Sequence, residues 1–134
     1  MSELAASLAN KVVRIALIGA SNKPERPSYG VMRFLLAKGY TVYPVNPGLH
    51  GQTIQGQPVY VSLAECPAPV DMVDIFRNTE GAASVIDEAI TLRHALDIKV
   101  IWCQLGVTPH EAAARAQEAG LTVVMNECPA IVWR

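Results

Sequence analysis

The chain has 134 residues, of which 51% are hydrophobic and 17% are charged, and its formal net charge is −1. This length favours one domain, and the low share of charged residues excludes a disordered chain. The near-neutral total also excludes a protein that coats nucleic acid through bulk positive charge. We therefore expect no nucleic-acid partner.

The charges are distributed unevenly along the chain. Six basic residues and a single acid, Glu25, lie between Lys11 and Ala64, whereas five basic residues and ten acids follow from Glu65 onward. A basic first half suggests that this half binds an anionic ligand. Two solvated faces that differ in charge are the alternative interpretation.

The cysteines and the N-terminus indicate a reducing compartment. Cys66, Cys103 and Cys128 cannot all pair, and no two of them form a Cys-x-x-Cys motif. The histidines are scattered, so we expect no metal site. The first residues lack the pattern of a signal peptide, and no apolar run approaches the ~20 residues of a membrane span. We therefore expect a cytoplasmic protein without a membrane partner.

Apolar runs and helical periods alternate through the chain. A leading helix is predicted within residues 1–11, and a capping box at residues 62–65 predicts a short helical turn. Residues 48–58 are predicted to form a loop. The other predicted elements are strands over 12–18, 40–45, 70–76, 98–103 and 121–125 and helices over 29–38, 78–96 and 109–120, the last capped by Thr108.

This alternation predicts an α/β fold. Because crossovers between parallel strands are right-handed, we expect a doubly wound parallel sheet of about five strands with helices on both faces, in a single domain over 12–134. Ligands bind such sheets at the carboxyl ends of the strands. That rule directs attention to four loops, which span residues 19–28, 45–51, 76–79 and 104–107.

The first of these loops carries groups suited to phosphate. Gly19 permits a tight turn, and the amides at the start of the following helix favour an anion. Ser21 supplies a hydroxyl, and Lys23 and Arg26 can pair with phosphate. Ser28 is the predicted helix cap. An ordinary strand-to-helix turn with solvated side chains is the alternative.

The same loop does not match the dinucleotide fingerprint. Ser21 and Pro24 stand where the motif needs glycines, and no acid lies between Glu25 and Glu65 to hold a ribose. A nicotinamide-dependent reductase therefore lacks two parts of its site and remains the second hypothesis.

The other three loops each offer one or two candidate ligand contacts. Asn46 can bond a nucleotide edge or ribose, and the alternative is a turn residue. Phe76 can cover a base, Arg77 can reach an anion, and Asn78 is expected to cap the long helix. Gln104, which ends a strand, suits a hydrogen bond to the ligand.

Several motifs, in the same order along the chain, resemble the small single-domain CoA-binding proteins, a family similar to the CoA-binding domain of the succinyl-CoA synthetase α subunit. The resemblance covers about Val12 to Pro129. Its motifs are Ile18-Gly19-Ala20-Ser21, Arg26-Pro27-Ser28-Tyr29, Gly39-Tyr40, Pro44-Val45-Asn46-Pro47, Val70-Asp71-Met72-Val73-Asp74-Ile75-Phe76-Arg77-Asn78, Trp102-Cys103-Gln104-Leu105-Gly106-Val107 and Cys128-Pro129.

The resemblance implies a Rossmann-like domain that binds coenzyme A or an acyl-CoA. By analogy, Gly19, Ala20, Ser21 and Asn22 hold the phosphates, Asn46 and Pro47 lie beside the adenosine, Phe76 and Arg77 flank the nucleotide, and Gln104 and Leu105 line the path of the pantetheine arm. Relatives often place a lysine after the Pro-Val-Asn-Pro turn. Here Gly48-Leu49-His50 follows, so the lysine that would meet the 3′-phosphate is missing from this turn.

The resemblance implies no catalytic residue. The synthetase's phosphorylated histidine belongs to a domain without a counterpart in these residues, and no Ser-His-Asp or Cys-His set can be assembled. We therefore expect a non-catalytic binding module. A third hypothesis, a regulatory subunit whose protein partner supplies the chemistry, is prompted by an apolar tail, Ile131-Val132-Trp133, expected to be exposed.

Overall fold

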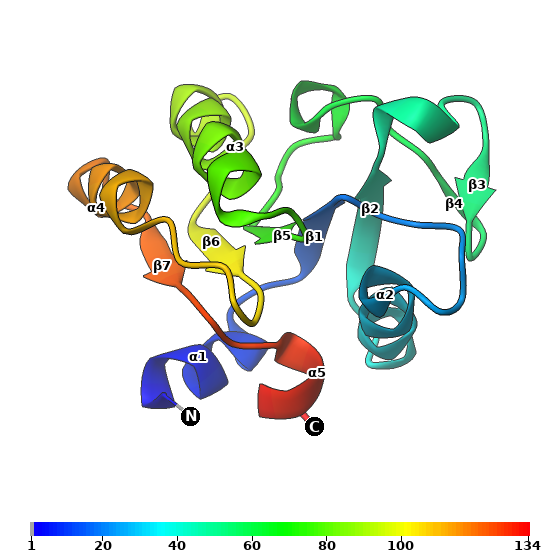
Figure 1. The fold of residues 1–134 in the computed structure, drawn as a ribbon, viewed down its shortest axis with the longest axis horizontal. Coiled ribbons are helices and arrows are strands. Elements are labelled where there is room, and N and C mark those ends of the chain that lie inside the picture. The colour runs from blue at the N-terminus through cyan, green and yellow to red at the C-terminus, as the bar shows by residue number, and fades with distance from the viewer. Residues whose placement is uncertain (1) are drawn as a thin grey trace.

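The computed structural model describes residues 2–134, and five parallel strands form its central sheet in the order β2-β1-β5-β6-β7 (Figure 1). The first connection leads from β1 to β2, and the chain then crosses back to place β5 on the other side of β1. The doubly wound parallel sheet predicted from the sequence is therefore confirmed. The strands are β1 (Arg14–Ile18), β2 (Thr41–Val45), β5 (Met72–Ile75), β6 (Val100–Cys103) and β7 (Thr122–Val124).

Helices cover both faces of this sheet (Figure 1). One face carries α3 (Thr79–Leu92) and α4 (His110–Glu118), and the other carries α1 (Glu3–Ser7), α2 (Pro27–Ala37) and α5 (Pro129–Val132). Three short 3-10 turns complete the helical elements: η1 (Leu8–Asn10), η2 (Pro47–Leu49) and η3 (Leu63–Glu65). Within residues 2–134, no helix has the length and apolar character needed to cross a membrane. The predicted division into a leading helix over 1–11 and a domain over 12–134 stays a prediction, and Met1 lies outside the described residues.

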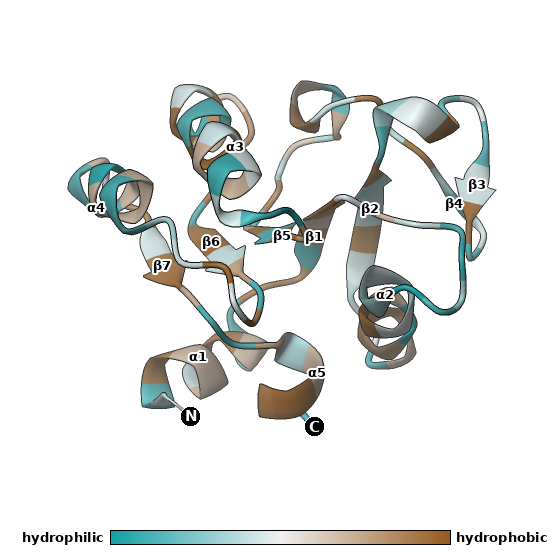
Figure 2. Cartoon of the chain, in the orientation of Figure 1, coloured by the Kyte–Doolittle hydropathy of each residue, from teal (hydrophilic) through white to brown (hydrophobic). Residues whose placement is uncertain are grey.

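The strands are apolar because both of their faces are buried. In β5, Met72 joins the core under α1, α2 and α5, whereas its neighbour Val73 joins the core under α3 and α4. Figure 2 shows apolar colour on β6, on the end of β7 and on α5, and hydrophilic colour over the visible part of β5 and much of α4. This two-sided burial explains why the strands read as nearly continuous apolar runs.

The predicted loop over residues 48–58 is partly wrong, because it contains a small antiparallel hairpin of β3 (Thr53–Ile54) and β4 (Gln57–Pro58). Gln55 and Gly56 join the strands with φ angles of 49° and 82°. Two consecutive residues at positive φ are typical of a tight hairpin turn. The strands are too short for their alternation to be seen in the sequence.

The structure corrects three predicted helix caps and confirms one. The side chains of Ser62 and Thr108 make no cap hydrogen bond, and Ser28 lies inside the first turn of α2 rather than before it. Asn78 does cap α3, since its Oδ1 accepts a hydrogen bond from the Gly81 amide at 2.7 Å.

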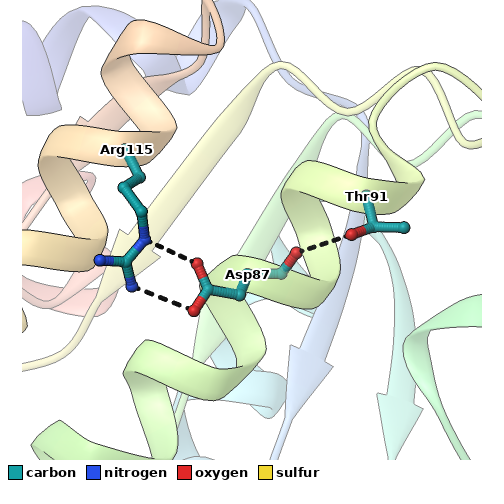
Figure 3. A network of polar contacts seen from close by, with 3 residues as sticks. All are labelled: Asp87, Thr91 and Arg115. Carbon is teal, nitrogen blue, oxygen red and sulfur yellow. Dashed lines mark hydrogen bonds and ion pairs between the residues drawn. The ribbon is translucent and has the colours of Figure 1, made fainter.

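One ion pair joins the two helices on the same face of the sheet (Figure 3). The Arg115 guanidinium on α4 donates from Nε and Nη2 to the two carboxylate oxygens of Asp87 on α3, each at 3.0 Å. Hydrogen bonding to Asp87 raises the pKa of Arg115. Both side chains are about half exposed, so solvent screens the pair. It orients α4 against α3 rather than carrying the stability of the fold.

The C-terminal tail is not the exposed apolar segment that the sequence predicts. Trp133 is 7% exposed, and its indole lies 5.3 Å from the rings of both Tyr40 and Trp102. Its Nε1 donates to the Ala5 carbonyl at 2.9 Å. Only Ile131 in this tail is strongly exposed, at 47%. The tail therefore completes the core under α1 and α2.

Candidate ligand-binding cleft

Two adjoining hollows lie at the carboxyl ends of the strands, beside the point where the strand order reverses between β1 and β5. The larger, which we call the main cleft, has a volume of about 580 Å³, and its smaller neighbour has about 440 Å³. Gly19, Asn46 and Arg77 line both. All four predicted loops contribute walls, so the sheet places them together as expected.

The loop after β1 passes very close to the end of β5. Gly19 has a φ angle of +85°, and a Cβ atom there would lie 2.3 Å from the Phe76 carbonyl oxygen. The Phe76 amide donates to the Ile18 carbonyl at 2.8 Å, which fixes the two strand ends together. Only glycine fits this approach.

The amides of Gly19 and Ala20, two residues that the family resemblance places at the phosphates, are already bonded within the protein. The amides of Gly19 and Ala20 both donate to the Val45 carbonyl, at 3.1 and 3.2 Å. They are turned toward β2, so they tie two loops together instead of facing a ligand. Gly19 and Ala20 still line the main cleft.

The anion-binding character of the loop comes from its later residues. Ser21 and Ser28 line the main cleft, and Ser28 is 4% exposed with a hydroxyl that makes no hydrogen bond within residues 2–134. Ser28 lies in the first turn of α2, where the helix dipole favours negative charge. Pro27 has no N–H and the Tyr29 amide donates to the Arg26 carbonyl at 3.0 Å, so the Ser28 amide is the one in this turn that a ligand can use. Arg26 also lines the cleft, so a cation stands beside this helix end.

Asn22 and Lys23, the other predicted phosphate contacts, are exposed and line neither hollow. The Lys23 amide donates to the Ser21 Oγ at 3.0 Å, which fixes the serine side chain within the loop. The contact of Asn22 and Lys23 with a ligand stays a prediction.

The side chain of Asn46 stabilises the turn after β2, which was the alternative to a ligand contact. Its Oδ1 accepts from the Gly48 amide at 2.8 Å, and its Nδ2 donates to the Ala20 carbonyl at 2.8 Å. These bonds hold the loop after β2 against the loop after β1. Pro47 follows and lines the smaller hollow.

Phe76 and Arg77 form the wall beyond β5. Phe76 is half-buried in the main cleft, and Arg77 is exposed at the junction of the two hollows. The Arg77 guanidinium makes no hydrogen bond or ion pair within the described part of the chain. It therefore presents a solvated cation to whatever occupies the junction.

Gln104 is held by a buried carboxyl group. Its Nε2 donates to Asp74 Oδ1 at 2.6 Å, and the other oxygen, Oδ2, is buried without a hydrogen-bond partner within residues 2–134. Burial raises the pKa of Asp74 to about 7, against the lowering effect of the Gln104 bond. Gln104 lines the main cleft, so Asp74 fixes a cleft side chain from behind.

The burial of Asp74 predicts a pH-dependent stability. The folded-state pKa is raised, so between about pH 4 and pH 7 the unfolded chain loses a proton that the folded chain keeps. Wild-type stability therefore falls across this window as pH rises and then levels off. Asp74→Asn removes the titration, and the variant should gain about 4 kcal/mol relative to wild type from pH 4 to pH 8, since each pKa unit between the unfolded and folded states is worth about 1.4 kcal/mol. Urea unfolding at several pH values measures this, and parallel profiles for the two proteins would contradict it.

The thiols near the cleft stay neutral. Burial raises the pKa of Cys103 to about 12, and the charge of Asp74 acts in the same direction. Burial also raises the pKa of Cys128, which lines the main cleft. Within residues 2–134, no cluster of three His, Cys, Asp or Glu side chains could hold a metal ion.

Several cleft residues were not among the predicted contacts. No ligand contact was predicted for Val31, which falls in the predicted helix over 29–38, or for Pro27, which falls in the predicted loop over 19–28. Asn78 and Val107 flank residues that were predicted. The additional residues of the main cleft are Pro27, Val31, Asn78, Val107 and Cys128. All of them except Val31 belong to motifs that carry the family resemblance.

Comparisons with known proteins agree with this geometry. A family model described as a CoA binding domain matches residues 13–134. The uncharacterized protein YneT of Bacillus subtilis is 35% identical over 115 residues, which cover 86% of this chain and 81% of YneT. A Thermus thermophilus protein of solved structure superimposes with a TM-score of 0.86 at 34% identity, over 98% of this chain and 96% of that one.

A third relative is much longer than this chain. The α subunit of the ADP-forming acetate–CoA ligase I of Pyrococcus furiosus is 37% identical over 78 residues, which cover 55% of this chain but 17% of the subunit. Together the matches confirm the resemblance inferred from the motifs.

Proposed function

This chain belongs to the CoA-binding domain family, and from that premise we propose that it binds coenzyme A or an acyl-CoA in the main cleft without catalysing a reaction itself. One observation carries the proposal. All the predicted contact residues except Asn22, Lys23 and Pro47 line a single cleft, and Pro47 lines the hollow that adjoins it.

The pyrophosphate binds between the loop after β1 and the start of α2. Ser21 and Ser28 offer hydroxyl groups there, and the first turn of α2 offers the Ser28 amide and a favourable dipole. Arg26 and Arg77 supply positive charge from two sides. Charge-assisted bonds of this kind are the strong contacts of phosphate sites.

The rest of the ligand extends to both sides of this anion site. The adenosine lies toward Asn46 and Pro47 and against Phe76, where the two hollows meet. The pantetheine arm lies along Gln104 and Leu105. The Gln104 carboxamide, fixed by Asp74 at 2.6 Å, is suited to bond an amide of that arm.

The absence of catalysis in the proposal rests on the state of the cysteines. A nucleophilic cysteine needs a thiolate, whereas burial raises the pKa values of both Cys103 and Cys128. The Pyrococcus furiosus relative is one subunit of a ligase. A protein partner that supplies the chemistry is therefore compatible with this binding role.

Isothermal titration with CoA and acetyl-CoA tests the proposal. Wild-type protein should bind, and Ser21→Glu should weaken binding by at least about 100-fold, because it sets a carboxylate against the ligand phosphates. Ser7→Glu is the matched control, since Ser7 is exposed on α1 and lines neither hollow. Its affinity should equal that of wild type.

Two further measurements separate the competing functions. Native mass spectrometry of freshly purified protein should show a noncovalent adduct with the mass of CoA or a thioester of CoA. NADPH should not displace a fluorescent CoA analogue. Tight binding of NADPH with no response to millimolar CoA would overturn the proposal in favour of a nicotinamide-dependent reductase.

A further inference from the structure

A third hollow, with a volume of about 210 Å³, adjoins the main cleft. Leu105 and Cys128 line both, so the two spaces share these side chains as a common border at the loop after β6. The far wall comes from Ile131 and Val132 of α5. We call this space the side hollow. It lies next to the residues along which the pantetheine arm is proposed to run.

The polar residues of the side hollow are already bonded elsewhere. Asn126 Oδ1 accepts from the Gly106 amide at 2.7 Å. The Glu127 carboxylate accepts from the Ser2 amide at 3.1 Å and from the Ser2 hydroxyl at 3.0 Å. The Glu127 carbonyl accepts from Trp102 Nε1 at 2.8 Å. Beside these bonds, the Asn126 Nδ2 group, which has no hydrogen bond within residues 2–134, the apolar side chains and the Cys128 thiol are the groups that can meet an occupant.

Two of those apolar side chains are unusually exposed. Leu105 is 59% exposed and Ile131 is 47% exposed. Only Leu4 and Val13 are comparable among the large apolar residues of the described chain, and neither lines this space. Covering Leu105 and Ile131 with apolar atoms would remove their surface from water, at about 25 cal/mol per Å².

We propose that the side hollow receives the acyl chain of a short-chain acyl-CoA, and that Leu105 and Ile131 contact that chain. This inference rests on the proposed binding of CoA in the main cleft. The thioester is at the end of the pantetheine arm, and the side hollow opens from the wall along which that arm extends. The acyl chain then enters the side hollow directly from the thioester.

The volume limits the length of the chain. A water-sized group takes about 30 Å³ in the liquid, so a space of about 210 Å³ holds on the order of seven such groups. An acyl chain of about four to six carbons fills it. A long fatty chain would leave most of its length in solvent.

Titration with a series of thioesters tests this assignment. CoA, acetyl-CoA, butanoyl-CoA, hexanoyl-CoA and dodecanoyl-CoA are compared by calorimetry. The Kd should fall about two- to fourfold for each added methylene up to about six carbons, because burial of a CH₂ group gives at most about 0.8 kcal/mol. It should then reach a plateau. Equal Kd values for CoA and hexanoyl-CoA would overturn the side-hollow assignment while leaving the binding of CoA intact.

Two substitutions of Ile131 change the hollow in opposite ways. Ile131→Ser removes apolar contact and Ile131→Trp fills the space, so each should abolish most of the gain from acetyl- to hexanoyl-CoA. The Kd of CoA itself should change less than twofold. Val13→Ser, a matched exposed apolar residue outside the side hollow, should keep the full gain.

Methyl NMR of wild-type protein gives a second readout. The Ile131 methyl signals should shift with hexanoyl-CoA much more than with CoA. If the gain with chain length persists in both Ile131 variants, or if these signals do not respond, the chain binds elsewhere and the inference is wrong. If CoA and every thioester fail to bind to wild type, it is the proposed function that fails.

Discussion

Replacing Gly19 with alanine is expected to destabilise the fold and weaken CoA binding at the same time. The positive φ angle of +85° costs an alanine about 1–2 kcal/mol. The new Cβ would also lie 2.3 Å from the Phe76 carbonyl oxygen, which belongs to the backbone and can move only if the end of β5 moves. Overpacking of this kind adds about 1–3 kcal/mol. The total loss should be about 2–5 kcal/mol by urea unfolding.

The displaced segment carries Phe76 and Arg77, so the Kd for CoA should rise more than tenfold. Gly39→Ala separates strain from displacement. Gly39 has a φ angle of +97°, yet nothing lies within 4 Å of an added Cβ atom. This control should lose about 1–2 kcal/mol from strain alone and keep wild-type affinity. Equal losses in the two variants would show that the contact with Phe76 does not determine the shape of the cleft.

The succession of strands and helices along the chain is predictable because each element is marked by an apolar pattern in its own segment. A strand that is buried on both faces must be apolar throughout, as Ile15 to Ile18 and Met72 to Ile75 are, apart from Asp74. A helix that covers one face of the sheet must repeat its apolar residues, as Ala82, Ile86 and Ala89 do. Burial constrains the residues of each segment independently of the other segments, so these patterns are visible in one sequence.

The position of the cleft follows from topology in the same way. Once the strands are parallel, the loops that follow them, which start near Gly19, Asn46, Phe76 and Gln104, must meet at one edge of the sheet. Their chemistry can then be read from residue types. The sequence therefore identifies most of the residues that line the main cleft.

Features that depend on contacts between distant residues are not predictable in this way. The amides of Gly19 and Ala20 turn to the Val45 carbonyl because β2 lies beside β1 at that point. Asp74 is an acid within an apolar strand, and its role depends on Gln104, which comes from another strand. No local pattern in the sequence indicates the hydrogen bonds to the Val45 carbonyl or the one between Asp74 and Gln104.

The burial of the C-terminal tail is another long-range feature, and it leads to a large effect. Trp133→Ala should destabilise the protein by about 3–5 kcal/mol, which is the usual cost of removing a buried aromatic side chain. The substitution removes packing against Tyr40 and Trp102 and the hydrogen bond from Trp133 Nε1 to the Ala5 carbonyl. Urea unfolding followed by circular dichroism measures the loss.

Two matched variants separate the contribution of the Ala5 hydrogen bond from that of the buried ring. Trp133→Phe keeps an aromatic ring but loses the bond to Ala5, so it should lose about 1–3 kcal/mol. Ile131→Ala, in the same helix but 47% exposed, should stay within about 0.5 kcal/mol of wild type. If Trp133→Ala also stays within that range, the tail is not docked in solution. The wall that α5 gives to the side hollow would then be absent too, and the dependence of affinity on acyl-chain length should disappear with it.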